Sequence, residues 1–259
     1  MPRHVNLFEP LTLRGVTFRN RIFMSPMCQY SCNTRMPSDW HLVHLGSRAV
    51  GGVGLVMVEA TAVSPEGRIS PGDMGIWSDA QVEAFARIVK FVREQGAIAG
   101  IQLGHAGRKT STVAPWEGNE MVPESAGDRP PVAPSAIPFN DADPAPREMN
   151  EADIEKVLSD FESATRRALS AGFQTIELHA AHGYLPHEFL SPLTNQRGDQ
   201  YGGSLDNAWR WKLLDGYAQS FRKSCRCLSE SRRRTGWMAA GTWINRYNSA
   251  NALSRLASI

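Results

Sequence analysis

The sequence has few cysteines, and their spacing limits the kinds of protein it can be. Its 259 residues include four cysteines, too few for the disulfide framework that stabilises small secreted domains. Cys28 and Cys32 are separated by three residues, and Cys225 and Cys227 by one. Neither pair has the two-residue gap of common zinc sites. We therefore predict no metal site.

The sequence also lacks long apolar runs and the common nucleotide-binding motifs. No run approaches the roughly 20 apolar residues that span a bilayer, and residues 1–10 lack the apolar stretch of a signal peptide. A cytoplasmic protein without a membrane segment is the default interpretation. No Gly-x-Gly-x-x-Gly and no Gly-x-x-x-x-Gly-Lys-Ser/Thr occurs, so the sequence supports neither a Rossmann unit nor a P-loop.

Positive charge is concentrated at the C-terminal end. From Arg222 onward there are eight Lys or Arg and one acid, Glu230, whereas residues 1–221 carry 20 basic and 25 acidic residues. A basic tail can bind nucleic acid or anionic lipid, but this one has no clear amphipathic period and forms no recognisable module. We therefore expect no nucleic-acid partner, and we divide the chain into residues 1–221 and a basic tail, residues 222–259.

Before the tail, short apolar runs alternate with stretches of helical periodicity. Strands are predicted at residues 21–27, 55–60, 97–103 and 175–178; helices are predicted at 41–50, from Ser78 to Gly96, from Asn150 to Gly172, and from Ser204 through Tyr217. A Pro- and acid-rich loop at residues 113–148 is long enough to be functional or to contain short elements of its own. The alternation predicts an α/β fold with a parallel sheet. The better assignment is the first half of a TIM (β/α)₈ barrel, which needs about 250 residues for eight units.

The last predicted strand leads into a group of polar side chains. Residues 175–184 read TIELHAAHGY, which places His179, His182 and Tyr184 at and just beyond the strand's carboxyl end, where ligands bind in parallel α/β folds. Two imidazoles can donate to a developing oxyanion, and a phenol can deliver a proton. The alternative is that the histidines satisfy buried polar groups at a strand end. His187 and Glu188, which follow closely, favour a site.

Six short segments together resemble one known family. They are SPMCQY (25–30), VEA (58–60), IQLGHAGRK (101–109), HAAHGY (179–184), HEFLSP (187–192) and YGGS (201–204). In this order they resemble the old yellow enzyme family of FMN-dependent ene-reductases, and most of all its class with a cysteine beside the flavin. The resemblance covers roughly residues 5–220, and it implies a TIM barrel that uses NADPH or NADH to reduce activated carbon–carbon double bonds of enones.

The resemblance also implies a role for each matched position. The positions implied to contact FMN are Ser25, Pro26, Met27, Cys28, Ala60 and Gln102, with Ala60 and Gln102 each at the end of a strand. His179 and His182 would bind the substrate's carbonyl oxygen, Tyr184 would protonate its α-carbon, and Tyr30 would close the substrate pocket. Outside this motif, Cys28 would be interpreted as a small buried hydrophobe and Gln102 as a loop hydrogen-bonder. Arg108 and Lys109 receive no role.

The sequence departs from the family after the YGGS turn. The family usually has Glu/Asp-Asn-Arg there, whereas this chain has Asp206-Asn207-Ala208, and a fifth strand with its flavin-contacting arginine cannot be located beyond about Arg222. The expected phosphate-binding loops are missing, which suggests a truncated or frame-altered product. The alternative function is therefore a non-catalytic fragment that does not retain FMN. A dienoyl-CoA reductase-like relative is disfavoured because Cys225 and Cys227 do not supply an iron–sulfur cluster. An oligomer is possible.

Overall fold

The fold is organised around one parallel sheet, seen in a computed structural model that describes residues 6–118, 120–122, 130–204 and 207. The sheet contains β3 (Phe23–Met24), β4 (Leu55–Ala62), β5 (Ile98–Gly104) and β8 (Thr175–Leu178) in that order, with every pair parallel. Strand order follows chain order, as it does in a (β/α) barrel. The predicted α/β class with part of a barrel is confirmed.

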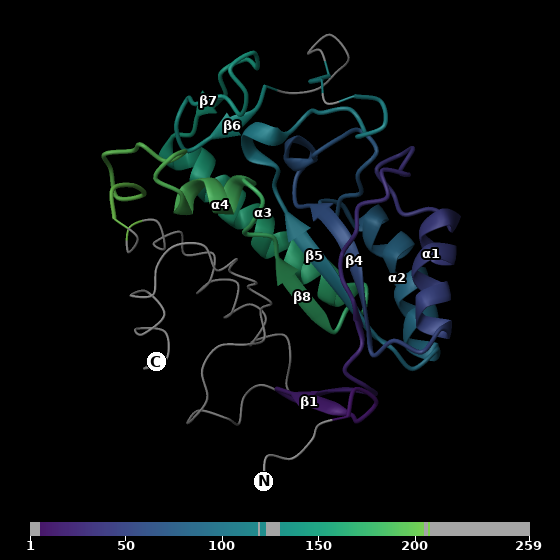
Figure 1. Ribbon diagram of the computed structural model, residues 1–259. Coiled ribbons are helices and arrows are strands. Elements are labelled where there is room, and N and C mark those ends of the chain that lie inside the picture. Colours follow the sequence, from purple (N-terminus) through teal and green to yellow (C-terminus); the bar gives the residue numbers. More distant parts are fainter. Residues whose placement is uncertain (1–5, 119, 123–129, 205–206, 208–259) are drawn as a thin grey trace.

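Three helices cover one face of this sheet (Figure 1). They are α1 (Asp39–Val50), α2 (Asp79–Glu94) and α3 (Glu151–Ser170). Buried side chains recur at helical spacing along each of them, as at Phe85, Ile88, Val89 and Val92 of α2. They pack against the strand residues that point to the same face, and together they form the main hydrophobic core. The strand residues of this core include Val56, Val58, Ala99, Ile101, Leu103, Ile176 and Leu178.

The helix starts follow the capping residues. Ser78 and Asn150, from which these helices were predicted to start, are the N-caps of α2 and α3, and the Asn150 side chain accepts a hydrogen bond from Asp153 N at its capping box. The first helix begins at Asp39 rather than at the predicted residue 41. The reason is that Ser38 caps it, with Ser38 N donating to His41 Nδ1 over 3.0 Å.

An antiparallel hairpin, which we did not predict, packs against the strands. It pairs β1 (Leu11–Leu13) with β2 (Val16–Phe18) around Arg14 and Gly15, which both have positive φ. Phe18 lies in a second apolar cluster with Leu55, Met57 and Ile98, residues at or near the amino ends of β4 and β5. Figure 1 shows β1 below those strands. The hairpin therefore covers the amino end of the sheet and leaves ligand access to its carboxyl end.

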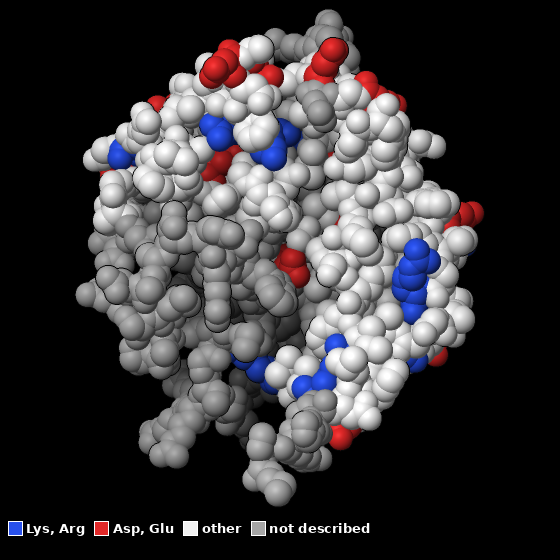
Figure 2. Space-filling view, in the orientation of Figure 1, with Lys and Arg blue, Asp and Glu red and all other residues white. Residues whose placement is uncertain are grey.

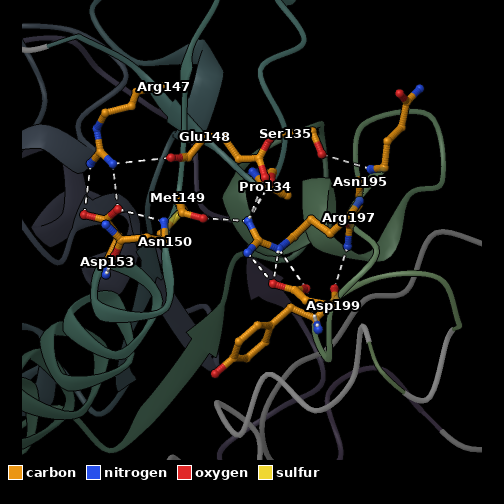
Figure 3. Close-up of polar contacts among 12 residues, drawn as sticks. Pro134, Ser135, Arg147, Glu148, Met149, Asn150, Asp153, Asn195, Arg197 and Asp199 are labelled. Carbon is orange, nitrogen blue, oxygen red and sulfur yellow. Dashed lines mark hydrogen bonds and ion pairs between the residues drawn. The ribbon is translucent and has the colours of Figure 1, made fainter.

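The long loop contains short elements of its own, as predicted. A parallel pair forms between β6 (Val132–Ala133) and β7 (Arg147–Glu148). Arg197 secures this pair from a later segment, because its guanidinium donates to Pro134 O at 2.9 Å and to Met149 O at 2.6 Å while it pairs with Asp199 (Figure 3). The loop is thereby held against the segment that ends in the YGGS turn.

Two strands are longer than predicted, which changes the position of two site residues. β4 extends to Ala62 and β5 to Gly104, so Ala60 and Gln102 lie within their strands and not at the strand ends. The remaining elements are the 3₁₀ turns η1 (Pro65–Gly67) and η2 (Gly107–Lys109) and the short helix α4 (Leu185–Leu190). The predicted helix after Ser204 and the basic tail 222–259 lie outside the described residues. Within the described part of the chain, no helix is long and apolar enough to cross a bilayer.

Candidate active site

The strand face opposite the helices carries small and polar residues in two rows. Ladder register aligns Ala60, Gln102 and Glu177 across β4, β5 and β8. Two residues further along, Ala62 aligns with Gly104. His179 joins this second row, because its N–H donates to Leu103 O and so places it beside Gly104. Side chains alternate between the two faces of a strand, so both rows point away from the helix-packed core. This inner face is the surface available to a ligand.

His179, His182 and Tyr184 lie together where β8 ends. The His179 ring is edge-on to both neighbours, with its centroid 5.1 Å from that of His182 and 4.8 Å from that of Tyr184. β8 has the predicted bounds, and the chain then turns at His182, whose φ is +58°. The structure thus brings the three predicted side chains into one cluster at the carboxyl end of the sheet.

Burial fixes the protonation of two members of this cluster. Desolvation, followed by His182, Lys109 and His187, lowers the pKa of His179 to about 4. Desolvation, with smaller contributions from Cys28 and Tyr30, raises the pKa of Tyr184 well above its usual value. Near neutral pH the cluster therefore contains a neutral imidazole that can donate through N–H, and a phenol that retains its proton.

Lys109 supports the cluster from η2, although no role was predicted for it. Its ammonium donates to His182 O over 3.1 Å, and it lies 5.1 Å from the centre of the Tyr184 ring and 4.5 Å from that of Phe139. The bond to His182 O holds the residue whose positive φ is costly for a side chain other than glycine. Figure 2 shows Lys and Arg side chains gathered above the strands' carboxyl ends, in the region of β6 in Figure 1.

The Cys28–Tyr30 segment approaches the same cluster from the other side. The Cys28 thiol lies beside the backbone of Ala60 and the Tyr30 hydroxyl, and burial raises the pKa of Cys28 to about 12. Burial likewise raises the pKa of Tyr30 to about 12, and the Tyr30 ring packs edge-on against Trp116 at 5.6 Å. Four of the predicted residues are therefore neighbours: Cys28, Tyr30, Ala60 and Tyr184.

The preceding residues of that segment contribute exposed surface. Ser25 and Met27 are exposed and Pro26 is half-buried. Their side chains leave free surface beside Cys28, which is compatible with the predicted flavin contact. The geometry around Ser25 and Pro26 does not test that contact, so their predicted role stays a prediction.

A small pocket lies between the cluster and the loop after β4. Its lining includes Ala60, Ile69, Asp73, His105, His179 and Tyr184. Asp73 is buried, and its Oδ2 accepts from Ser70 N over 2.6 Å, while Oδ1 has no hydrogen-bond partner among the described residues. Burial, with a further contribution from Glu59, raises the pKa of Asp73 to about 7. Sequence reasoning missed this carboxyl group, because an aspartate in a Pro-Gly-rich turn carries no signal of burial.

Gln102 is paired with a carboxylate on the inner face. Its Nε2 donates to Glu177 Oε1 over 2.6 Å, so the amide carbonyl remains available as an acceptor. Further along β5, a Cβ added at Gly104 would approach no atom closer than His179 Cβ at 3.5 Å. Packing alone therefore does not require glycine there. The bare backbone leaves room beside His179, and with the Gln102 amide it suits a flat polar ring such as a flavin.

Three further polar residues bind backbone amides of the loops around the pocket. They are His105, His187 and Glu188. Glu188 is fully buried, its Oε1 accepts from Arg108 N over 2.9 Å, and burial raises its pKa to about 8. His105 Nδ1 accepts from Gly107 N, and His187 Nδ1 accepts from Gly183 N. His187 and Glu188, which favoured a site in the sequence, thus support the backbone around it. No group of three potential metal ligands occurs within the described residues.

A parallel sheet in chain order with a polar cluster at the carboxyl ends of its strands is the arrangement found in the β/α-barrel class of proteins. Residues 6–214 match the model of the NADH:flavin oxidoreductase / NADH oxidase family. Because this match covers most of the sequence, the chain belongs to that family. The expected family is confirmed.

Curated relatives agree with the family assignment but are longer than this chain. The chain is 51% identical over 207 residues to an NADPH dehydrogenase of Geobacillus thermodenitrificans, with 79% of this chain and 56% of the relative covered. It is 51% identical over 208 residues to an NADH:flavin oxidoreductase of Gibberella zeae, with 79% of this chain and 50% of the relative covered. The chain thus spans about half the length of the curated relatives it matches.

Solved structures of this family superpose on the described fold. A morphinone reductase in complex with tetrahydroNAD gives a TM-score of 0.75 at 32% identity, covering 85% of this chain and 62% of that one. The old yellow enzyme homologue from Zymomonas mobilis gives 0.69 at 34% identity, covering 85% and 60%. The fold of this chain therefore corresponds to part of the fold of these proteins.

Proposed function

We propose that this chain belongs to an FMN-dependent NAD(P)H oxidoreductase that reduces the activated carbon–carbon double bond of an enone. The observation that carries the proposal is the cluster of His179, His182 and Tyr184 at the carboxyl end of β8, where His179 and Tyr184 line a pocket. The names of the relatives, NADPH dehydrogenase and NADH:flavin oxidoreductase, support the same reaction class.

Residues of this chain would hold the cofactor along the inner face of the sheet. The Gln102 carbonyl would accept a hydrogen bond from the polar edge of the ring, and Ala60 and Gly104 would let the ring approach the strands. The stretch from Ser25 to Cys28, in which Ser25 and Met27 are exposed, would contact the ring from the edge of the sheet at β3. When bound, FMN would supply the hydride that reduces the alkene.

The histidine–tyrosine cluster would act on the substrate. The neutral His179 imidazole would donate to the carbonyl oxygen together with His182, which stabilises negative charge as it develops there. Tyr184, which retains its proton near neutral pH, would deliver that proton to the α-carbon. Tyr30 would close the pocket over the substrate.

An absorbance experiment tests the proposal. Purified protein incubated with FMN and desalted should be yellow, its flavin spectrum should bleach with NADPH, and cyclohexenone should restore the colour. The rate of bleaching is also measured with NADH, and the comparison with NADPH shows which nicotinamide is the preferred hydride donor. Protein that stays colourless after FMN incubation would contradict the proposal for this chain and would favour the alternative, a non-catalytic fragment that does not retain FMN. Iron in the purified protein would instead favour a dienoyl-CoA reductase-like enzyme.

A further inference from the structure

A bulge in β4 changes the direction in which the Glu59 side chain points, compared with a regular strand. Val58 pairs with Ile101 and Ala60 pairs with Gln102, so Glu59 is an extra residue at a register shift in the ladder. Such a bulge leaves one residue unpaired and re-aims its side chain. The Glu59 side chain is buried, with 4% exposed, and its Oε2 accepts from Gln29 N over 2.6 Å. The bulge therefore joins the middle of β4 to the segment that contains Cys28 and Tyr30.

The His41 ring lies beside the other oxygen of the same carboxyl group. His41 is buried, and its Nε2 lies 3.4 Å from Glu59 Oε1. Because His41 Nδ1 accepts from Ser38 N at the start of α1, the other ring nitrogen, Nε2, is the one that faces Glu59. The Glu59 carboxyl group thus lies between the His41 ring, which is anchored at the N-cap of α1, and the backbone of Gln29.

We propose that Glu59 is a positioning residue that fastens the Cys28–Tyr30 segment to β4 and so sets a carboxyl group near the Cys28 thiol. This inference rests on the proposed function only in calling that segment part of a flavin site. Neither the sequence motif nor the comparisons assign Glu59 a role. Glu59 is not one of the residues that line the pocket beside the histidine–tyrosine cluster, and it acts through Gln29 and Cys28.

Electrostatics supports the second half of the proposal. Burial is the largest cause of the raised pKa of Cys28, and the negative charges of Asp73 and Glu59 add to it, while the backbone bond from Ala60 opposes it. Tyr30 and Tyr184 also face the thiol, and their pKa values are raised. Cys28 is thus surrounded by acids and phenols, and a thiolate there would be repelled by the Glu59 carboxylate.

Two substitutions separate the fastening from the charge. Glu59→Gln removes the charge but retains an oxygen that can accept from Gln29 N, whereas Glu59→Leu removes both. Glu83→Gln is the matched control, because it makes the same change at an exposed position on α2. All four proteins are studied without FMN, so the result does not depend on whether the chain binds flavin.

The charge is tested through the reactivity of Cys28 towards iodoacetamide between pH 8 and 10. Cys28 and Cys32 share the tryptic peptide 22–35, and fragment ions of that peptide distinguish the two labels. Glu59→Gln should alkylate Cys28 roughly three- to tenfold faster than wild type, which corresponds to a pKa decrease of about half a unit to one unit. Equal rates in Glu59→Gln and Glu83→Gln would overturn the electrostatic role.

The fastening is tested by hydrogen–deuterium exchange of the Cys28–Tyr30 segment. Wild type and Glu59→Gln should protect the Gln29 amide equally, and Glu59→Leu should lose at least tenfold of that protection. Unchanged protection in Glu59→Leu would overturn the fastening. If Glu59→Leu does not fold, the wild-type protein alone decides: a Gln29 amide that exchanges there as fast as a solvent-exposed amide also overturns the fastening. Failure of wild type to bind FMN would count against the proposed function alone and would leave both measurements valid.

Discussion

The two faces of the parallel sheet differ in what they bury. On the helix-covered face, Ile101 and Leu103 of β5 are fully buried among apolar side chains of α2 and α3. On the inner face, Gln102 of the same strand points to Glu177, and Gly104 lies beside His179. Neighbouring residues of one strand thus serve opposite purposes. The helix-covered face supplies the free energy of folding, and the inner face presents groups that can bind and protonate a ligand.

This difference predicts which substitutions will affect the reaction and which will affect stability. Changes at the carboxyl end of the inner face should alter a half-reaction with little effect on unfolding. Changes in the groups that hold the surrounding loops and helices should instead alter the free energy of unfolding and its dependence on pH. The following expectations run from the largest effect to the smallest.

Tyr184→Phe should have the largest effect, and only on one half-reaction. Flavin reduction by NADPH needs no proton from the phenol, so its rate should be nearly unchanged. Reoxidation by cyclohexenone should slow by roughly 10²- to 10⁴-fold, the range typical of losing a general acid. Stopped-flow absorbance separates the two steps. Equal slowing of both would mean that Tyr184 supports structure or flavin binding instead of donating a proton.

His179→Ala should weaken stabilisation of the developing oxyanion. Loss of one such donor typically costs about 2.7–4 kcal/mol of transition-state stabilisation, measured here as kcat/KM for enone reduction. The midpoint of urea unfolding should change little, because His179 closes a strand end and does not belong to the main core. An activity loss below about 1 kcal/mol, or a loss matched by unfolding, would mean that the ring only satisfies buried polar groups at a strand end.

Glu188 should make stability depend on pH. Burial raises the pKa of Glu188 from 4.5 to about 8, so between these values the folded protein holds a proton that the unfolded chain has released. Its contribution to stability is therefore complete below about pH 4.5 and is lost as pH rises towards 8, by at most about 1.4 kcal/mol per pH unit. Glu188→Gln should flatten this slope in urea titrations from pH 5 to 8. Glu83→Gln serves as the exposed control, and a slope that both variants share with wild type would contradict the assignment.

Asn150→Ala should have a small effect confined to stability. The Asn150 side chain accepts from Asp153 N over 2.9 Å at the start of α3, and removing such a cap costs about 1 kcal/mol. Urea unfolding should detect this decrease, while FMN binding should be unaffected. A matching loss of FMN affinity would show that α3 and the inner face are coupled.

Sequence reasoning located the last strand of the sheet more accurately than the hairpin at the sheet's amino end. The strand at residues 175–178 was predicted with its observed bounds, because Gly172 ends the preceding helix with φ of +93° and polar residues follow the strand. The hairpin β1–β2 was missed because two strands of three residues give too short an alternation to recognise. The only local signal was Arg14-Gly15, which suits a tight turn.

The burial of Glu59 and Asp73 could not be predicted from the sequence, for a physical reason. Whether a carboxylate lies inside or outside depends on a register shift in β4 and on the path of the loop after it, and both arise from long-range packing. The same limit applies to Ala60 and Gln102, which the motif identified but placed at the strand ends. Each strand continues for two further residues, so these side chains lie one row deeper.

The most direct test of the two-face account compares neighbouring residues of β5. Gln102→Ala should weaken FMN binding by about three- to tenfold, the value of one ordinary hydrogen bond, with little change in unfolding. Ile101→Val should cost about 1 kcal/mol of stability and leave the FMN dissociation constant unchanged. Fluorescence titration with FMN gives the dissociation constant of each variant, and urea unfolding gives its free energy of unfolding. Substitutions that each shift both quantities to the same extent would contradict the division between a stabilising face and a binding face.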